Sequence, residues 1–139
     1  MDTPTSSSLA IAHRLHDTVN RHDLDGMARC FAADFVNETP IHPARSFRGR
    51  DQVRKNWAQI FAAVPNLEAD MVSCVSQGDS VWTEWEMRGT RLDGARHLMR
   101  GVSIFEVADD AFAAVRFYLE PVELTGVGID AAVKSALGR

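Results

Sequence analysis

The sequence predicts an α+β domain in which three N-terminal helices cover a cone-shaped, curved antiparallel sheet and enclose an apolar cavity. Apolar residues recur at helical spacing in the first half of the chain and alternate with polar residues after Leu67. Short turn sequences separate the alternating segments, so consecutive strands should pair as an antiparallel meander. Each helix has an apolar stripe to bury, and one face of the sheet is the surface that can receive it.

The helical half contains three predicted helices. The first covers residues 8–21, where apolar residues share one face (Ala12, Leu15, Val19). Asp23 is the expected N-cap of a short second helix with its apolar residues inward (Leu24, Met27, Ala28, Phe31). The third helix covers residues 50–64, ends at Pro65-Asn66, and has one wide apolar face (Val53, Trp57, Ile60, Phe61, Val64). Residues 1–7 are predicted to be a flexible tail, and residues 8–139 a single domain.

The remaining elements are strands and turns. A short strand over residues 34–40 is stopped by Pro40, and residues 41–46 form a loop. Four further strands are predicted at residues 68–76, 80–90, 96–107 and 112–120, with turns at residues 77–79, 93–94 and 109–110. Residues 129–137 are expected to add a final helical turn or two.

Composition narrows the class of protein. A chain of 139 residues with 45% hydrophobic and 24% charged residues is typical of one soluble globular domain. The net charge of −4, without a block of like charge, argues against nucleic acid or a membrane as partner. No apolar stretch approaches a membrane span, and the polar N-terminus does not resemble a signal peptide, so a cytoplasmic location is expected. Cys30 and Cys74 are expected to be reduced core thiols.

Alternation along the strands predicts which side chains face the cavity. The inward sets are apolar or small (Thr83, Trp85, Met87; Met99, Gly101, Ser103, Phe105; Val115, Phe117, Leu119). The outward sets are largely charged (Trp82, Glu84, Glu86, Arg88; Arg116, Tyr118, Glu120). A one-residue bulge would reverse any of these assignments.

Several segments resemble a known family. They are HDLDGM at residues 22–27, FRGRD at 47–51, GTRLDG at 89–94, MRGVSIF at 99–105 and RFYLEP at 116–121. With these segments the chain resembles a SnoaL-like, polyketide cyclase-like protein of the nuclear transport factor two-like superfamily over residues 9–125. The superfamily also includes ketosteroid isomerases, limonene epoxide hydrolases and scytalone dehydratase. The segments are mostly turns, caps and core, so they identify the fold better than a reaction.

The resemblance implies catalytic positions that this chain fills with other residues. Ketosteroid isomerases need a carboxylate base and two acidic oxyanion donors, and those positions match Thr39, Leu15 and Ser103, of which only Ser103 can donate a hydrogen bond. In limonene epoxide hydrolases, Asn37 matches the water-positioning asparagine. The tyrosine and the charged set of those enzymes are replaced here (Phe35; Trp85, Met87, Phe117). SnoaL-type cyclases use an inward aspartate on a late strand, for which Glu120 is the nearest acid.

The catalytic candidates are therefore His16, Asn37 and Glu120. His16 shares the helical stripe of Ala12 and Val19, and a histidine can transfer protons near neutral pH; the alternative is a half-buried histidine bonded to backbone. The predicted ligand-binding residues are Leu15, Trp57, Trp85, Met87, Met99, Ser103, Phe105 and Phe117, with plain core packing as the alternative. His42 is predicted to be a solvated loop residue. His13, His16 and Asp17 have helical metal-ligand spacing, but no metal or other cofactor is predicted.

Two functions fit these residues. One is a cofactor-free isomerase, cyclase or dehydratase-type enzyme acting on a lipophilic cyclic or polyketide-like compound, with His16 as base and Asn37 and Ser103 as hydrogen-bond donors. The other is a non-catalytic module that binds a hydrophobic small molecule, or a dimeric scaffold. Homodimers are common in the resembled family, so a homodimer through the outer sheet face around Trp82 is expected, with Glu86 and Arg100 paired across strands.

Overall fold

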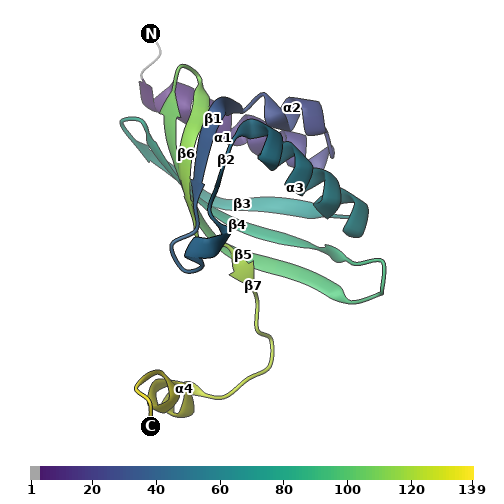
Figure 1. The fold of residues 1–139 in the computed structure, drawn as a ribbon, viewed down its shortest axis with the longest axis vertical. Coiled ribbons are helices and arrows are strands. Elements are labelled where there is room, and N and C mark those ends of the chain that lie inside the picture. Colours follow the sequence, from purple (N-terminus) through teal and green to yellow (C-terminus); the bar gives the residue numbers. More distant parts are fainter. Residues whose placement is uncertain (1–3) are drawn as a thin grey trace.

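The computed structural model describes residues 4–139 and has the predicted α+β architecture (Figure 1). Three helices, α1 (Pro4–Asn20), α2 (Leu24–Ala28) and α3 (Arg50–Ala63), lie over the concave face of one curved sheet. A fourth helix, α4 (Ile129–Ala136), lies clear of this body at the end of the chain. The predicted fold class is confirmed.

Helix α1 begins at Pro4, four residues before the predicted start at Ser8. Proline suits the first turn of a helix, because its missing N–H would have no partner there and its φ is already helical. Residues 4–7 of the predicted tail are helical, and residues 1–3 lie outside the described residues. Helix α2 has the predicted N-cap, since the Asp23 carboxylate accepts a hydrogen bond of 2.9 Å from the Gly26 backbone N–H.

The sheet has the strand order β2-β1-β6-β5-β4-β3, and β7 pairs with β5. Its strands are β1 (Phe31–Glu38), β2 (Phe47–Arg48), β3 (Glu68–Gln77), β4 (Ser80–Thr90), β5 (Arg96–Ala108), β6 (Ala111–Phe117) and β7 (Glu120–Pro121). Strands β3 to β6 form the predicted antiparallel meander. Strand β1 joins the meander beside β6 and runs parallel to it, so the sheet is mixed and not wholly antiparallel. The alternation of residues within a strand does not indicate whether a partner strand distant in sequence, here β6, runs parallel or antiparallel to it.

The last long strand of the meander is interrupted before Glu120. Strand β6 ends at Phe117 and pairing resumes only at β7, while both segments lie along β5. Opposite the interruption, Gly101 has φ 151°, and a Cβ at this position would lie 2.2 Å from the Tyr118 carbonyl oxygen. The two backbones therefore approach more closely than any side chain at residue 101 permits.

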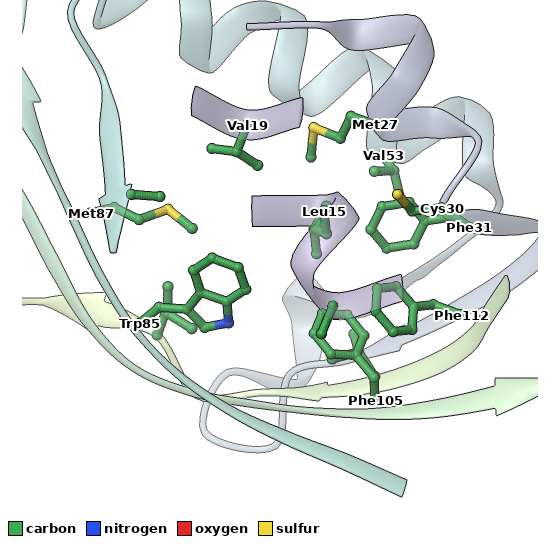
Figure 2. Packing of buried hydrophobic residues seen from close by; sticks show 14 of the residues in the cluster. Leu15, Val19, Met27, Cys30, Phe31, Val53, Trp85, Met87, Phe105 and Phe112 are labelled. Carbon is green, nitrogen blue, oxygen red and sulfur yellow. The ribbon is translucent and has the colours of Figure 1, made fainter. Parts of the chain in front are cut away.

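The core lies between the helices and the concave face of the sheet. Figure 2 shows the two sets of side chains facing each other (Leu15, Val19 and Met27 from the helices; Trp85, Met87 and Phe105 from the sheet). Phe105 and Phe112 stack with ring centroids 3.9 Å apart, and Phe112 is fully buried. His22 stacks on Phe61 at 4.3 Å and bonds to the Leu67 carbonyl, which attaches the end of α1 to α3 and β3.

Residues 122–139 form a C-terminal arm that leaves the body after β7 (Figure 1). Every residue from Glu123 onward is exposed, including Ile129 at 76%. Ile129, Val133 and Leu137 recur every four residues and therefore share one apolar stripe. Within the described part of the chain, neither α4 nor any other helix has the length and hydropathy needed to span a membrane.

Candidate functional site

A cavity of about 340 Å³ lies between the helical layer and the concave face of the sheet. Its wall is mainly aliphatic and aromatic, with contributions from α1, α2, α3 and six strands, all but β3. The three helices cover one side, and the exposed residues of the wall, Arg45 in the loop after β1 and Pro121 in β7, mark the mouth of the cavity. An apolar body with a few polar groups is the common form of a small-molecule site.

The eight predicted ligand-binding residues all line this cavity. They are Leu15 from α1, Trp57 from α3, Trp85 and Met87 from β4, Met99, Ser103 and Phe105 from β5, and Phe117 from β6. The predicted strand alternation is confirmed on β4, because the outward neighbours Trp82 and Glu84 are exposed. Their contact with a ligand stays a prediction.

Hydrogen bonds hold the sheet side of the wall in place. The Trp85 indole N–H donates to the Thr83 hydroxyl at 2.7 Å, and that hydroxyl donates to the Ser103 carbonyl at 2.8 Å. All three residues are buried. The indole is thus held by neighbouring strands β4 and β5, and a rigid wall limits the entropy lost when a ligand binds.

Two buried polar side chains offer unused hydrogen-bonding groups to the cavity. Asn37 donates from Nδ2 to the Thr39 hydroxyl at 2.9 Å, while its Oδ1 has no partner among the described residues. The Ser103 hydroxyl also lacks a partner among them, although the residue is only 3% exposed. Both residues border the cavity, so both groups are positioned to bond with a molecule in it.

The cavity mouth contains a histidine–carboxylate pair. Nε2 of His42 lies 2.7 Å from Oε1 of Glu120, and both side chains are about one-third to two-fifths exposed, at 34% and 41%. Glu120 was predicted to point outward, but it lines the cavity. Glu120 follows the interruption at residues 118–119 and contacts His42 in the loop after β1. Its side chain therefore turns toward the mouth, although its backbone lies opposite the outward-facing Arg100 in the strand register. His42, predicted to be solvated, is half-buried here.

His16 is outside the cavity wall, in contrast to its predicted role as a base within it. Its ring contacts Asp17 at 3.3 Å and Asn20 at 3.1 Å, on the exposed side of α1. Successive helical residues point about 100° apart, so Leu15 faces the cavity and His16 turns away. The His16 ring stacks near Trp85 with centroids 6.3 Å apart, so His16 contacts a wall residue without lining the cavity itself.

Other reactive groups do not converge on this site. No group of three His, Cys, Asp or Glu residues is placed to hold a metal ion within the described residues. Cys30 and Cys74 are free thiols, and burial raises the pKa of both. A raised pKa keeps a thiol protonated and weakly nucleophilic at neutral pH.

The helices, the curved sheet and the enclosed cavity define the class of nuclear transport factor two-like folds. Within it, the chain belongs to the SnoaL-like domain family, whose sequence model matches residues 12–115.

Solved structures agree with this assignment. An LEH-like epoxide hydrolase of M. tuberculosis superposes with a TM-score of 0.72 at 18% identity, over 85% of this chain and 86% of that chain. A proposed SnoaL-like polyketide cyclase of Jannaschia has a TM-score of 0.73 at 19% identity, over 86% and 90%. A proposed ketosteroid isomerase of Kribbella flavida has a TM-score of 0.70 at 21% identity, over 91% and 87%. At these identities the likeness establishes the fold alone. A comparison with curated proteins found no match.

Proposed function

We propose that this protein is a cofactor-free enzyme that encloses a hydrophobic small molecule and moves a proton on it, as isomerases, cyclases and dehydratases do. The observation that carries the proposal is the Glu120–His42 pair, at 2.7 Å, on the mouth of an apolar cavity. A carboxylate can accept a proton from a bound substrate, and a hydrogen bond from a neighbouring imidazole fixes its position. In this proposal Glu120 is the base, the role first predicted for His16, and His42 holds the Glu120 carboxylate in position.

The inner polar groups supply the second part of the chemistry. When a proton leaves the carbon next to a carbonyl, negative charge develops on the carbonyl oxygen, and fixed donors stabilise it. The Ser103 hydroxyl and the second Nδ2 proton of Asn37 have no acceptor among the described residues and border the cavity. We therefore propose a lipophilic cyclic or polyketide-like carbonyl compound as substrate.

A non-catalytic binding module is the second candidate function. It is favoured by the position of the charges: the two charged side chains that described residues give to the wall, Arg45 and Glu120, lie at the mouth, and the described inner wall is neutral. A neutral, apolar interior is sufficient to hold a ligand without transforming it.

Hydrogen–deuterium exchange separates the two functions. We expect the parent protein to accelerate exchange of the α-protons of 2-tetralone in D2O, measured by NMR. Glu120→Gln should reduce that acceleration by about 10²–10⁴-fold, the usual contribution of a general base. The matched control is Glu123→Gln, which changes an exposed carboxylate of the arm. Exchange at the buffer rate while calorimetry shows 2-tetralone bound would instead support the binding module.

We also propose a homodimer formed through the outer face of the sheet. Val75, Trp82 and Ile104 are cross-strand neighbours there and form an apolar row over β3, β4 and β5, in which Val75 and Trp82 are exposed and Ile104 is buried. Trp82 is 48% exposed, which is unusual for so large an apolar side chain. The exposed stripe of α4 provides a second apolar surface, and an eight-residue helix gains stability mainly by packing.

The two free thiols fit a reducing compartment, so we further propose a cytoplasmic location.

A further inference from the structure

The charges of the cavity wall are unevenly distributed. Arg45 is the one cationic side chain of the wall among the described residues, and it belongs to the short 3₁₀ helix Pro43–Arg45 at the mouth. Its guanidinium makes no ion pair and no hydrogen bond with the described residues, and it is exposed. A guanidinium presents several donors in a planar fork that matches the two oxygens of a carboxylate.

A second unused donor lies on the same wall. Asn56 comes from α3, and its Oδ1 accepts a hydrogen bond of 2.8 Å from Nε2 of Gln52. This bond orients the amide, so that the NH₂ group of Asn56 remains without an acceptor among the described residues. Donors from two different elements, the 3₁₀ helix and α3, therefore border one cavity.

Glu120 limits where an anion can lie. Its carboxylate is the single negative group that the described residues give to the wall, and one of its oxygens is engaged by His42. A ligand anion beside Glu120 would be repelled, whereas an anion near Arg45 and Asn56 would meet only donors. Charge-assisted hydrogen bonds of this kind are about twice as strong as neutral ones.

We propose that the ligand of this cavity is an amphipathic acid, with its apolar body among the aromatic side chains and its carboxylate at the mouth on Arg45 and Asn56. The inference rests on the proposed binding of a hydrophobic small molecule in the cavity and adds the chemical class of that molecule. It also orients the ligand, because the acidic end stays at the mouth while the neutral end reaches Ser103 and Asn37.

A matched pair of probes tests the proposal. Isothermal titration calorimetry of the parent protein should show 2-naphthoic acid binding about tenfold more tightly than the isosteric neutral 2-naphthamide. Arg45→Met should remove this preference by weakening the acid about tenfold and leaving the amide within about twofold. The control Arg48→Met removes a nearby exposed charge of β2 that does not line the cavity, and it should preserve the preference. Raising the salt concentration should weaken the acid and not the amide.

The outcomes separate this inference from the proposed function. If the amide binds as tightly as the acid, or if Arg45→Met keeps the preference, the acidic ligand class is wrong while binding in the cavity stands. If neither probe binds the folded parent protein, both proposals fail. Thermal unfolding of each variant checks that the exposed substitutions leave the fold intact.

Discussion

The two faces of the curved sheet are built from alternate residues of the same strands, yet they meet different surroundings. On β4, Thr83, Trp85 and Met87 are buried beneath the helices, and Trp85 and Met87 border the cavity. Their neighbours Trp82 and Glu84 are exposed on the opposite face. Strand β4 thus forms part of the cavity wall on one side and an outer surface on the other, so a change at one residue affects mainly one face.

The two faces also differ in what stabilises them. The inner face is held by apolar burial and by the Trp85–Thr83–Ser103 hydrogen bonds. The outer face has exposed ion pairs, including Arg88 with Asp70 at 2.7 Å and Arg100 with Glu86 at 3.0 Å. Exposed pairs are screened by water and salt, whereas apolar burial contributes about 25 cal/mol per Å². The inner face should therefore contribute most of the stability.

The largest expected effect comes from the aromatic core. Phe112→Ala removes a fully buried ring that stacks on Phe105, and it should lower the free energy of unfolding by about 3–5 kcal/mol in urea titrations. The outer-face counterpart Arg88→Ala, which removes exposed ion pairs, should change it far less. Equal losses for the two variants would contradict the assignment of stability to the inner face.

An intermediate effect is expected for association. Trp82→Glu places a charge in the apolar row of the outer face. Light scattering should therefore show a shift from dimer to monomer. Thermal unfolding should show that the monomeric variant is still folded. Trp82→Phe keeps an aromatic ring and should remain dimeric. A parent protein that is monomeric at the same concentrations would overturn the proposed dimer.

The smallest effect concerns pH. His97 lies at the start of β5, and burial, followed by the nearby Arg91 charge, lowers the pKa of its imidazole from the ordinary value of 6.5. The unfolded chain then binds this proton more readily than the folded chain, so the free energy of unfolding should fall as pH drops below about 6.5. His97→Gln should flatten this part of the stability profile between pH 7.5 and 5. An unchanged slope would show that other groups control it.

Local patterns in the sequence predict the fold class, most element boundaries and the cavity wall. Alternation along β4 and β5 is a period-two signal, so Trp85, Met87 and Ser103 are placed correctly without knowledge of the partner strands. The α3 helix likewise shows its inward face in its spacing, and Trp57 lies on it.

The contacts missed from sequence join segments distant along the chain. His42 and Glu120 are 78 residues apart, and their pairing depends on β1 lying beside β6 and on the interruption before β7. Neither the β1–β6 pairing nor the interruption before β7 produces a periodic pattern in the sequence. His16 was misplaced for another reason: the apolar stripe of α1 is wide enough to accept either Leu15 or His16 at its margin, and only packing against the sheet selects Leu15.

The positions of the three tryptophans give the protein built-in optical reporters. Trp57 and Trp85 border the cavity from α3 and β4, whereas Trp82 lies on the outer face. Indole emission responds to local polarity and to quenching by a neighbouring molecule. In a Trp82→Phe background, the remaining fluorescence therefore comes only from cavity indoles and reports filling of the cavity. With phenylalanine at residues 57 and 85 instead, the remaining signal reports the outer face, so the two faces can be observed separately in the same solution experiment.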